Sequence, residues 1–137
     1  MGELALRVTA FYVQDVPATL DFYDRAFGMG MRYMHPSRGY AELETGDTLL
    51  SFVSEEFLTA ADLLGGTPVV CARRGEPLIG AQIALVSQDL DGDWRRAVAA
   101  GATILKAPEP KPWGQTVGYL LDLNGVIVEL CTPSSRD

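Results

Sequence analysis

Eight short stretches of the chain are rich in apolar, β-branched or aromatic residues, as strands are, and two others repeat apolar residues with a helical period. In the first half this pattern predicts one strand, one helix and three more strands: Leu6–Val13, the segment between Asp15 and Gly28, Met31–Met34, Tyr40–Leu43 and Thr48–Val53. The second half repeats the order: Ala81–Val86, a helix before Gly101, Thr103–Lys106, Val117–Leu121 and Val126–Cys131. We therefore expect an α+β fold built from two βαβββ modules in tandem.

The segment between the modules has a different composition. One or two helical turns are expected at Glu55–Leu64, and glycine and proline are frequent after them. The 137 residues suit a single domain, with module 1 at about 5–54, a linker at about 55–78 and module 2 at about 79–132. Such a linker is long enough to cross the molecule or to cover a site.

The two modules can be aligned residue by residue. Asp15 and Asp89, both expected as helix N-caps, match at an offset of 74 residues. Near the module ends, "GYAELETG" and "GYLLDLNG" suggest an offset of 79, but that pairing sets polar against apolar positions. An offset of 78 sets Leu43 on Leu121 and Ser51 on Glu129, and it keeps the face pattern, which a slip of one residue would invert.

Composition and charge exclude some classes of function. The net charge of −7 and the pI near 4.6 argue against nucleic acid, which requires a basic surface. The acidity is compatible with a cationic ligand, although it is explained more simply by solubility. No run of 18 apolar residues predicts a membrane span, and the N-terminal segment does not resemble a secretion signal. With only two cysteines, Cys71 and Cys131, we expect a reduced, cytoplasmic protein.

Two stretches, "FYVQDVPATLDFYDRAFGM" and "PWGQTVGYLLDLNGVIVEL", resemble the opening and closing motifs of the vicinal oxygen chelate superfamily. That superfamily holds glyoxalase I, bleomycin-resistance proteins and extradiol dioxygenases. The resemblance implies that the sheets curl into a concave cup, with helices on the outer face and ligand on the inner one. It also implies a homodimer, in some members formed by exchanging modules.

In metal-dependent members the ligands come from the first and last strand of each module. The matching positions here are Val8, Ser51, Gln82 and Glu129. Valine has no lone pair and a serine hydroxyl is a weak ligand, so we expect no metal and no other cofactor. If a divalent metal did bind, Gln82 and Glu129 would hold it. The chain's one histidine, His35, belongs to a predicted turn, which favours a solvated turn residue over a catalytic base.

Glu129 lies within an apolar strand, where a carboxylate is rarely left unpaired. Three interpretations remain open: a hydrogen-bonded partner of Gln82, a group that binds a cationic or hydrogen-bond-donating ligand, or half of a weak metal site. Strand parity places Tyr12 on the same inner face, and Trp113 lies in a Pro-rich loop that could line the cup or serve as an anchor. The candidate ligand-binding residues are Tyr12, Ser51, Gln82, Trp113 and Glu129.

The resemblance and the weak ligand set favour a non-catalytic protein that binds or sequesters a small molecule. The expected ligand is a planar compound, with a cation favoured by the acidic wall, and an antibiotic would fit this description. The alternative is a glyoxalase-type lyase or isomerase, or a dioxygenase, with an unusual metal or none. A third hypothesis is an enzyme that uses Glu129 as a general base.

Overall fold

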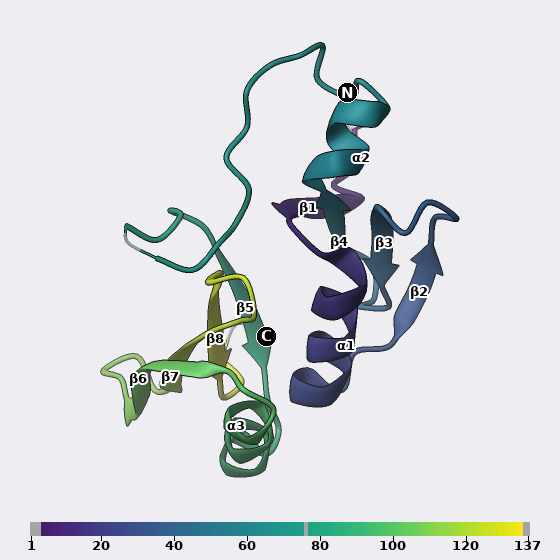
Figure 1. Ribbon diagram of the computed structural model, residues 1–137. Coiled ribbons are helices and arrows are strands. Elements are labelled where there is room, and N and C mark those ends of the chain that lie inside the picture. The colour runs from purple at the N-terminus through teal and green to yellow at the C-terminus, as the bar shows by residue number, and fades with distance from the viewer. Residues whose placement is uncertain (1–3, 76, 136–137) are drawn as a thin grey trace. The chain divides into compact units, whose positions relative to one another are not determined.

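The computed structural model describes residues 4–75 and 77–135. These residues form two four-stranded mixed sheets and three helices, and they divide into two compact units (Figure 1). One unit holds the first sheet and the other holds the second. The α+β class and the two tandem βαβββ modules are confirmed.

The first sheet has the strand order β1-β4-β3-β2, with β1 parallel to β4 and the other pairs antiparallel. Its strands are β1 Val8–Val13, β2 Met31–Met34, β3 Tyr40–Leu43 and β4 Leu49–Ser54. Two helices belong to this half of the chain, α1 Val16–Phe27 and α2 Glu55–Ala60. The second sheet repeats the topology as β5-β8-β7-β6. Its elements are β5 Gln82–Val86, α3 Leu90–Ala99, β6 Thr103–Pro110, β7 Thr116–Leu121 and β8 Ile127–Cys131.

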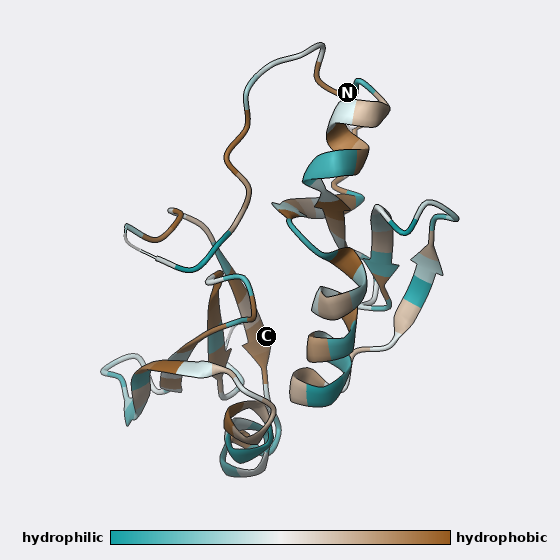
Figure 2. Cartoon of the chain, in the orientation of Figure 1, coloured by the Kyte–Doolittle hydropathy of each residue, from teal (hydrophilic) through white to brown (hydrophobic). Residues whose placement is uncertain are grey.

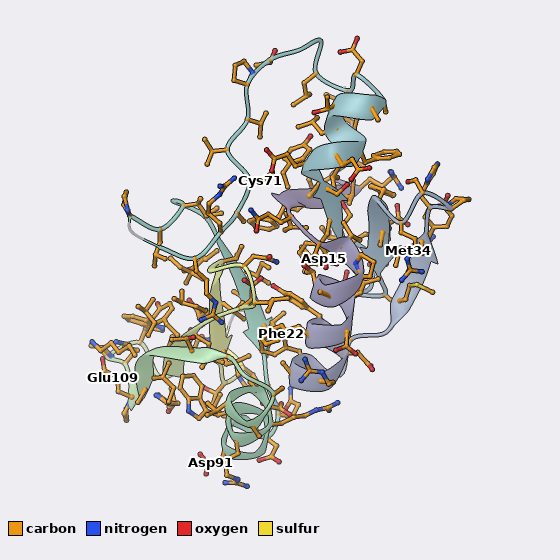
Figure 3. The ribbon with its side chains drawn as sticks, viewed as in Figure 1. Asp15, Phe22, Met34, Cys71, Asp91 and Glu109 are labelled. Atoms are coloured by element: carbon orange, nitrogen blue, oxygen red, sulfur yellow. The ribbon has the colours of Figure 1, made fainter. Side chains whose placement is uncertain are left out.

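The helices begin where the sequence predicts. The Asp15 side chain accepts from the Ala18 amide at 3.0 Å, and the Asp89 side chain accepts from the Gly92 amide at 3.2 Å. These aspartates are the N-caps of α1 and α3 and satisfy amides that have no partner within the helix. Asp15 lies at the start of α1 in Figure 3.

Helix α1 ends at Gly28, which adopts a left-handed conformation with φ 69°. The helix is amphipathic, and Figure 2 shows apolar and polar residues recurring turn by turn along it. Its Tyr23 ring packs 5.1 Å from the ring of Phe52 on β4. Phe11 lies beside Phe52 in the parallel pair β1–β4, so α1 covers the face of the sheet that carries these two rings.

The observed strand registers test the alignment of the two modules. Ala10 pairs with Ser51 in the first sheet, and Ala84 pairs with Glu129 in the second. Ala10 and Ala84 are 74 residues apart, the offset expected for the first strands. Their partners Ser51 and Glu129 are 78 residues apart, so the predicted match of Ser51 with Glu129 is confirmed.

The preceding strand follows a different offset. Leu43 pairs with Leu50, and Leu120 pairs with Val128, so Leu43 corresponds to Leu120 and not to Leu121. The expected match of Leu43 with Leu121 was wrong by one residue, because the two hairpin turns differ in length by one. The neighbouring Glu42 therefore corresponds to Tyr119.

The predicted Pro-rich loop is partly a strand. The expected strand Thr103–Lys106 continues to Pro110 as β6. Prolines are tolerated there because β6 is an edge strand and its pairing with β7 is interrupted by register shifts. Strands β2 and β3 have the predicted bounds, and the ends of the remaining strands differ from expectation by at most two residues. Helix α2 occupies only the first six residues of the predicted helical segment.

Both cysteines are buried, and neither forms a disulfide. In the part of the chain that the structure describes, no helix has the length and apolarity needed to cross a membrane.

Candidate functional site

The second sheet has one face against α3 and one face turned away from it. Gly118 and its cross-strand partner Leu130 belong to the α3 face, because a Cβ at Gly118 would lie 2.6 Å from the Trp94 ring of α3. Tyr119 and Glu129, the next cross-strand pair, therefore point to the opposite face. The predicted orientation of Glu129 away from the helix is confirmed.

The Gln82 side chain holds Glu129 in place. The amide Nε2 of Gln82 donates to Glu129 Oε1 at 3.1 Å, across the parallel pair β5–β8. Tyr119 is the cross-strand neighbour of Glu129 on β7. Burial raises the pKa of the Tyr119 phenol, and the nearby charge of Glu129 raises it further, so the phenol stays protonated at neutral pH. The predicted contact between Gln82 and Glu129 is present.

The charge of Glu129 is not neutralised by an ion pair within the described chain. Both lysines of this part of the molecule contact Glu109: Lys106 Nζ lies 3.0 Å and Lys111 Nζ 2.6 Å from Glu109 Oε1. These contacts lower the pKa of Glu109 to about 2, with Lys111 as the larger cause. Lys111 is also near enough to Tyr119 to oppose the rise in the pKa of that phenol. Glu109 lies at the outer end of β6 (Figure 3). Glu129, half-buried on the sheet face, thus has the neutral Gln82 amide as its hydrogen-bond partner and no ion pair within the described chain.

The first sheet carries a related pair in which the carboxylate and the hydroxyl have exchanged strands. Glu42 on β3 pairs directly with Ser51 on β4, at the positions that Tyr119 and Glu129 occupy in the second sheet. The acid is therefore on the third strand in one module and on the last strand in the other. Glu42 is nearly buried, with 8% of its surface exposed.

Unlike Glu129, Glu42 is paired with two cations. Arg7 Nη1 lies 3.7 Å from its Oε2, and Arg32 Nε lies 3.5 Å from its Oε1. The Tyr40 hydroxyl also donates to Oε2 at 2.7 Å. Burial raises the pKa of Tyr40, as does the hydrogen bond to Glu42. The Glu42 cluster is thus neutralised internally.

The structure buries Ser51 completely. Its Oγ has no partner that meets hydrogen-bond geometry among the described residues, although it lies close enough to Tyr40 to oppose the rise in the pKa of that phenol. A ligand can reach Ser51 only if the side chains that cover it move.

The other two predicted site residues differ in exposure. Trp113 is 64% exposed, and its indole N–H donates to Gln115 Oε1 at 2.9 Å. The Gln115 amide in turn donates to the Thr132 carbonyl at 2.7 Å, so the indole is tied to the strand end by a polar chain. Tyr12 is half-buried, and its carbonyl accepts from the Ala72 amide at 2.7 Å.

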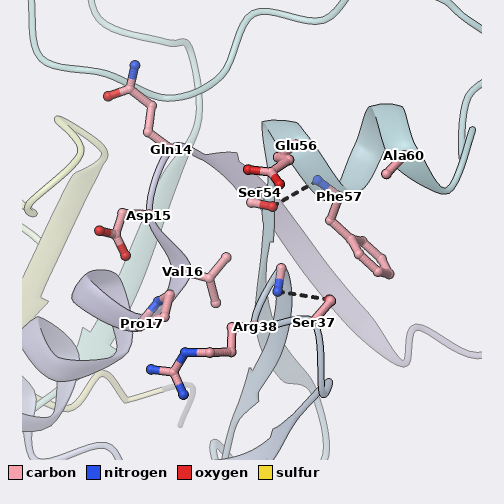
Figure 4. Close-up of a pocket in the computed structure, with 11 residues that line it drawn as sticks. Gln14, Asp15, Val16, Pro17, Ser37, Arg38, Ser54, Glu56, Phe57 and Ala60 are labelled. Carbon is pink, nitrogen blue, oxygen red and sulfur yellow. Dashed lines mark hydrogen bonds between the residues drawn. The ribbon is translucent and has the colours of Figure 1, made fainter.

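A separate pocket of about 230 Å³ lies at one end of the first sheet (Figure 4). The starts of α1 and α2 and the turn between β2 and β3 line it, through residues that include Asp15, Arg38, Ser54 and Phe57. None of the five predicted ligand-binding residues lines this pocket. This pocket is therefore separate from the Glu129 site.

His35 follows β2 and stabilises the turn that forms part of this pocket. Its Nδ1 accepts from the Ser37 amide at 3.0 Å and lies 2.8 Å from Ser37 Oγ, and its ring packs 5.0 Å from that of Phe57. The turn position agrees with the prediction, but the ring is half-buried and structural.

His35→Ala is expected to lower the free energy of unfolding by about 1 kcal/mol, because one hydrogen-bond acceptor and one ring contact are lost. His35→Asn retains an acceptor near Ser37 and should cost less. Urea denaturation followed by circular dichroism measures both variants, and equal losses would contradict the role assigned to Nδ1.

The model of the Glyoxalase/Bleomycin resistance protein/Dioxygenase superfamily matches residues 5–130. The chain belongs to this superfamily. No curated protein gives a significant match.

Solved structures with the same fold cover nearly the whole chain. TioX from Micromonospora sp. ML1 is 23% identical, with a TM-score of 0.69, over 94% of this chain and 98% of that one. A glyoxalase-related enzyme from Fulvimarina pelagi is 21% identical, with a TM-score of 0.74, over 94% and 88%. A glyoxalase/bleomycin resistance protein/dioxygenase family enzyme from Burkholderia phytofirmans PsJN is 20% identical, with a TM-score of 0.72, over 94% and 98%. At these identities the likeness establishes the fold.

The residues at the superfamily's metal-ligand positions do not fit a tightly held metal. Val8 offers no donor atom, Ser51 offers a buried neutral hydroxyl, and the Gln82 amide already donates to Glu129. Within residues 4–75 and 77–135, no three His, Cys, Asp or Glu side chains come together as a metal site would require. The donor set of this superfamily member therefore supports no step through a metal.

Sequence reasoning missed Tyr119 and the Glu42 cluster. In "YAEL", Tyr40 and Glu42 alternate with Ala41 and Leu43, so the period of two already places the acid opposite the helix-covered face. The one-residue error in the third strand hid the correspondence between Glu42 and Tyr119.

Proposed function

We propose that this superfamily member binds a small organic molecule without converting it, through the face of the second sheet that points away from α3. The observation that carries the proposal is Glu129, a half-buried carboxylate that accepts a hydrogen bond from Gln82 and has no ion pair within the described chain. A charge of this kind stabilises a bound cation, because its neighbour Gln82 already orients it.

The weak donor set supports binding without catalysis. An enzyme of this fold that used a metal would need good ligands at the positions of Val8 and Ser51, and neither residue is one. The exposed Trp113 ring provides a surface on which a planar compound can stack. An antibiotic is one class of compound with these properties, and the superfamily is named in part after bleomycin resistance.

Proflavine, a planar aromatic cation, tests the proposal. We expect it to bind the full chain in one-to-one stoichiometry, as measured by the change in its fluorescence. Glu129→Gln should weaken binding about 10- to 100-fold, because a charge-assisted contact contributes about 1.5–3 kcal/mol. Mass spectrometry of the released dye should show an unchanged compound.

The matched control is Asp47→Asn, which also removes one negative charge but lies exposed in the turn before β4. It should leave the affinity for proflavine unchanged. Equal weakening by both variants would show that net charge, and not the Glu129 site, attracts the dye. A chemically altered dye would favour an enzyme that uses Glu129 as a general base.

A further inference from the structure

The pocket of Figure 4 is lined by two opposite charges that do not pair. The Arg38 guanidinium comes from the turn between β2 and β3, and the Glu56 carboxylate comes from α2, on different sides of the hollow. Neither side chain makes a hydrogen bond or an ion pair with another residue of 4–75 or 77–135. A cation and an anion beside one small cavity therefore both remain able to bind a ligand.

Apolar side chains form another part of the lining. Val16, Pro17 and Phe57 contribute to it, and Val16 is buried with 1% of its surface exposed. The volume of about 230 Å³ lies below the range of pockets that hold drug-sized molecules, about 300–1,000 Å³. The cavity therefore suits a small molecule that has an apolar part as well as charged groups.

Arg38 adopts a backbone conformation that arginine rarely takes. Its φ of 63° lies in the left-handed region, where the Cβ of an ordinary residue is crowded and glycine is preferred. The turn holds it there: the Arg38 amide donates to the His35 carbonyl at 2.8 Å, and the Gly39 amide donates to Ser37 Oγ at 3.1 Å. Backbone strain of this kind is typical of functional positions. Because the guanidinium makes no contact that stabilises the described chain, the strain indicates a use for it outside the fold.

We infer that this pocket is a second binding site, which takes a small zwitterion of the α-amino-acid class. The ligand carboxylate pairs with Arg38 through charge-assisted hydrogen bonds, the ligand ammonium group pairs with Glu56, and its apolar side chain packs on Phe57. Asp15, whose Oδ1 caps α1, leaves Oδ2 as a second acceptor for the ammonium group. None of these residues belongs to the Glu129 site, so this inference does not rest on the proposed function.

Three compounds with the same carbon skeleton test the two charges separately. L-Valine carries both charges, isovalerate lacks the ammonium group and isobutylamine lacks the carboxylate. In amide NMR titrations of the full chain, we expect valine to shift the signals of Arg38, Glu56 and Phe57. Valine should bind at least about 10-fold more tightly than either analogue, the effect of one charge-assisted contact. Absence of these shifts, or an analogue that binds as tightly as valine, would overturn the zwitterion site.

The variant Arg38→Gly separates binding from folding. It should weaken valine binding at least about 10-fold and leave the free energy of unfolding unchanged or raised, because glycine suits the positive φ. The matched control is Asp62→Gly, at another residue with a positive φ, 50°, that does not line this pocket. It should leave the affinity for valine unchanged. Unchanged valine binding in Arg38→Gly, equal weakening by both variants, or a loss of stability in Arg38→Gly would contradict the role assigned to Arg38.

Discussion

Replacing Asp122 with alanine is expected to lower the free energy of unfolding by about 3 kcal/mol. Asp122 is fully buried at the turn between β7 and β8, and its Oδ1 accepts from the amides of Asn124 at 2.8 Å and Val126 at 2.9 Å. Alanine would leave both amides without an acceptor in a place that water does not reach. Chemical denaturation of the purified variant, followed by far-UV circular dichroism, measures the loss.

The corresponding turn of the first module provides the control. Asp47 lies exposed between β3 and β4, and Asp47→Ala should change the free energy of unfolding by less than about 0.5 kcal/mol. A loss below about 1 kcal/mol for Asp122→Ala, or an equal loss for both variants, would show that the buried carboxylate does not organise its hairpin. The proposed binding site depends on the same hairpin, because the hairpin sets Tyr119 opposite Glu129.

Gly118→Ala is the second change with a large expected effect, a loss of about 2 kcal/mol in the free energy of unfolding. The added Cβ would lie 2.6 Å from Trp94 Cζ3 and 2.9 Å from Pro108 Cγ, which is closer than carbon atoms approach. Trp94 is part of α3 and Pro108 is part of the edge strand β6, so the overlap would force the helix or the edge strand away from the sheet.

A double-mutant cycle tests whether the Trp94 ring causes this loss, and a substitution at a glycine with open space around it serves as the control. Combining Gly118→Ala with Trp94→Leu should recover at least about 1 kcal/mol relative to the sum of the two single changes, because the neighbour that clashes is gone. Gly80→Ala should be neutral or slightly stabilising, since a Cβ there meets nothing within 4 Å. Simple additivity in the cycle would indicate that Trp94 is not what excludes a side chain at position 118.

Helix-capping residues and the face pattern of the strands were enough to predict much of the fold. The N-caps Asp15 and Asp89 and the C-cap Gly28 are recognised from single residues, because capping depends on side-chain chemistry within one helical turn. The period of two placed Glu129 on the face away from the helix, and the face pattern gave the match of Ser51 with Glu129 that the strand registers confirm.

The remaining features depend on contacts between strands. The third-strand register is set by hairpin length, and a difference of one residue between the turns moved the match of Leu43 from Leu121 to Leu120. The extension of β6 through Pro108 is possible because the strand lies at a sheet edge, which sequence alone does not reveal. The contrast between Glu42 and Glu129 could not be foreseen either, since it depends on arginines from other strands or chain ends that meet only the first acid.

The most direct test of the account is to locate a bound aromatic cation on the chain. Backbone amide NMR spectra of the full chain should be recorded during a titration with proflavine. We expect the largest shifts at Gln82, Tyr119 and Glu129, on β5, β7 and β8, with none of similar size in Glu129→Gln. Shifts confined to the pocket of Figure 4, at Asp15, Arg38 and Phe57, would contradict the assignment of the site to Glu129.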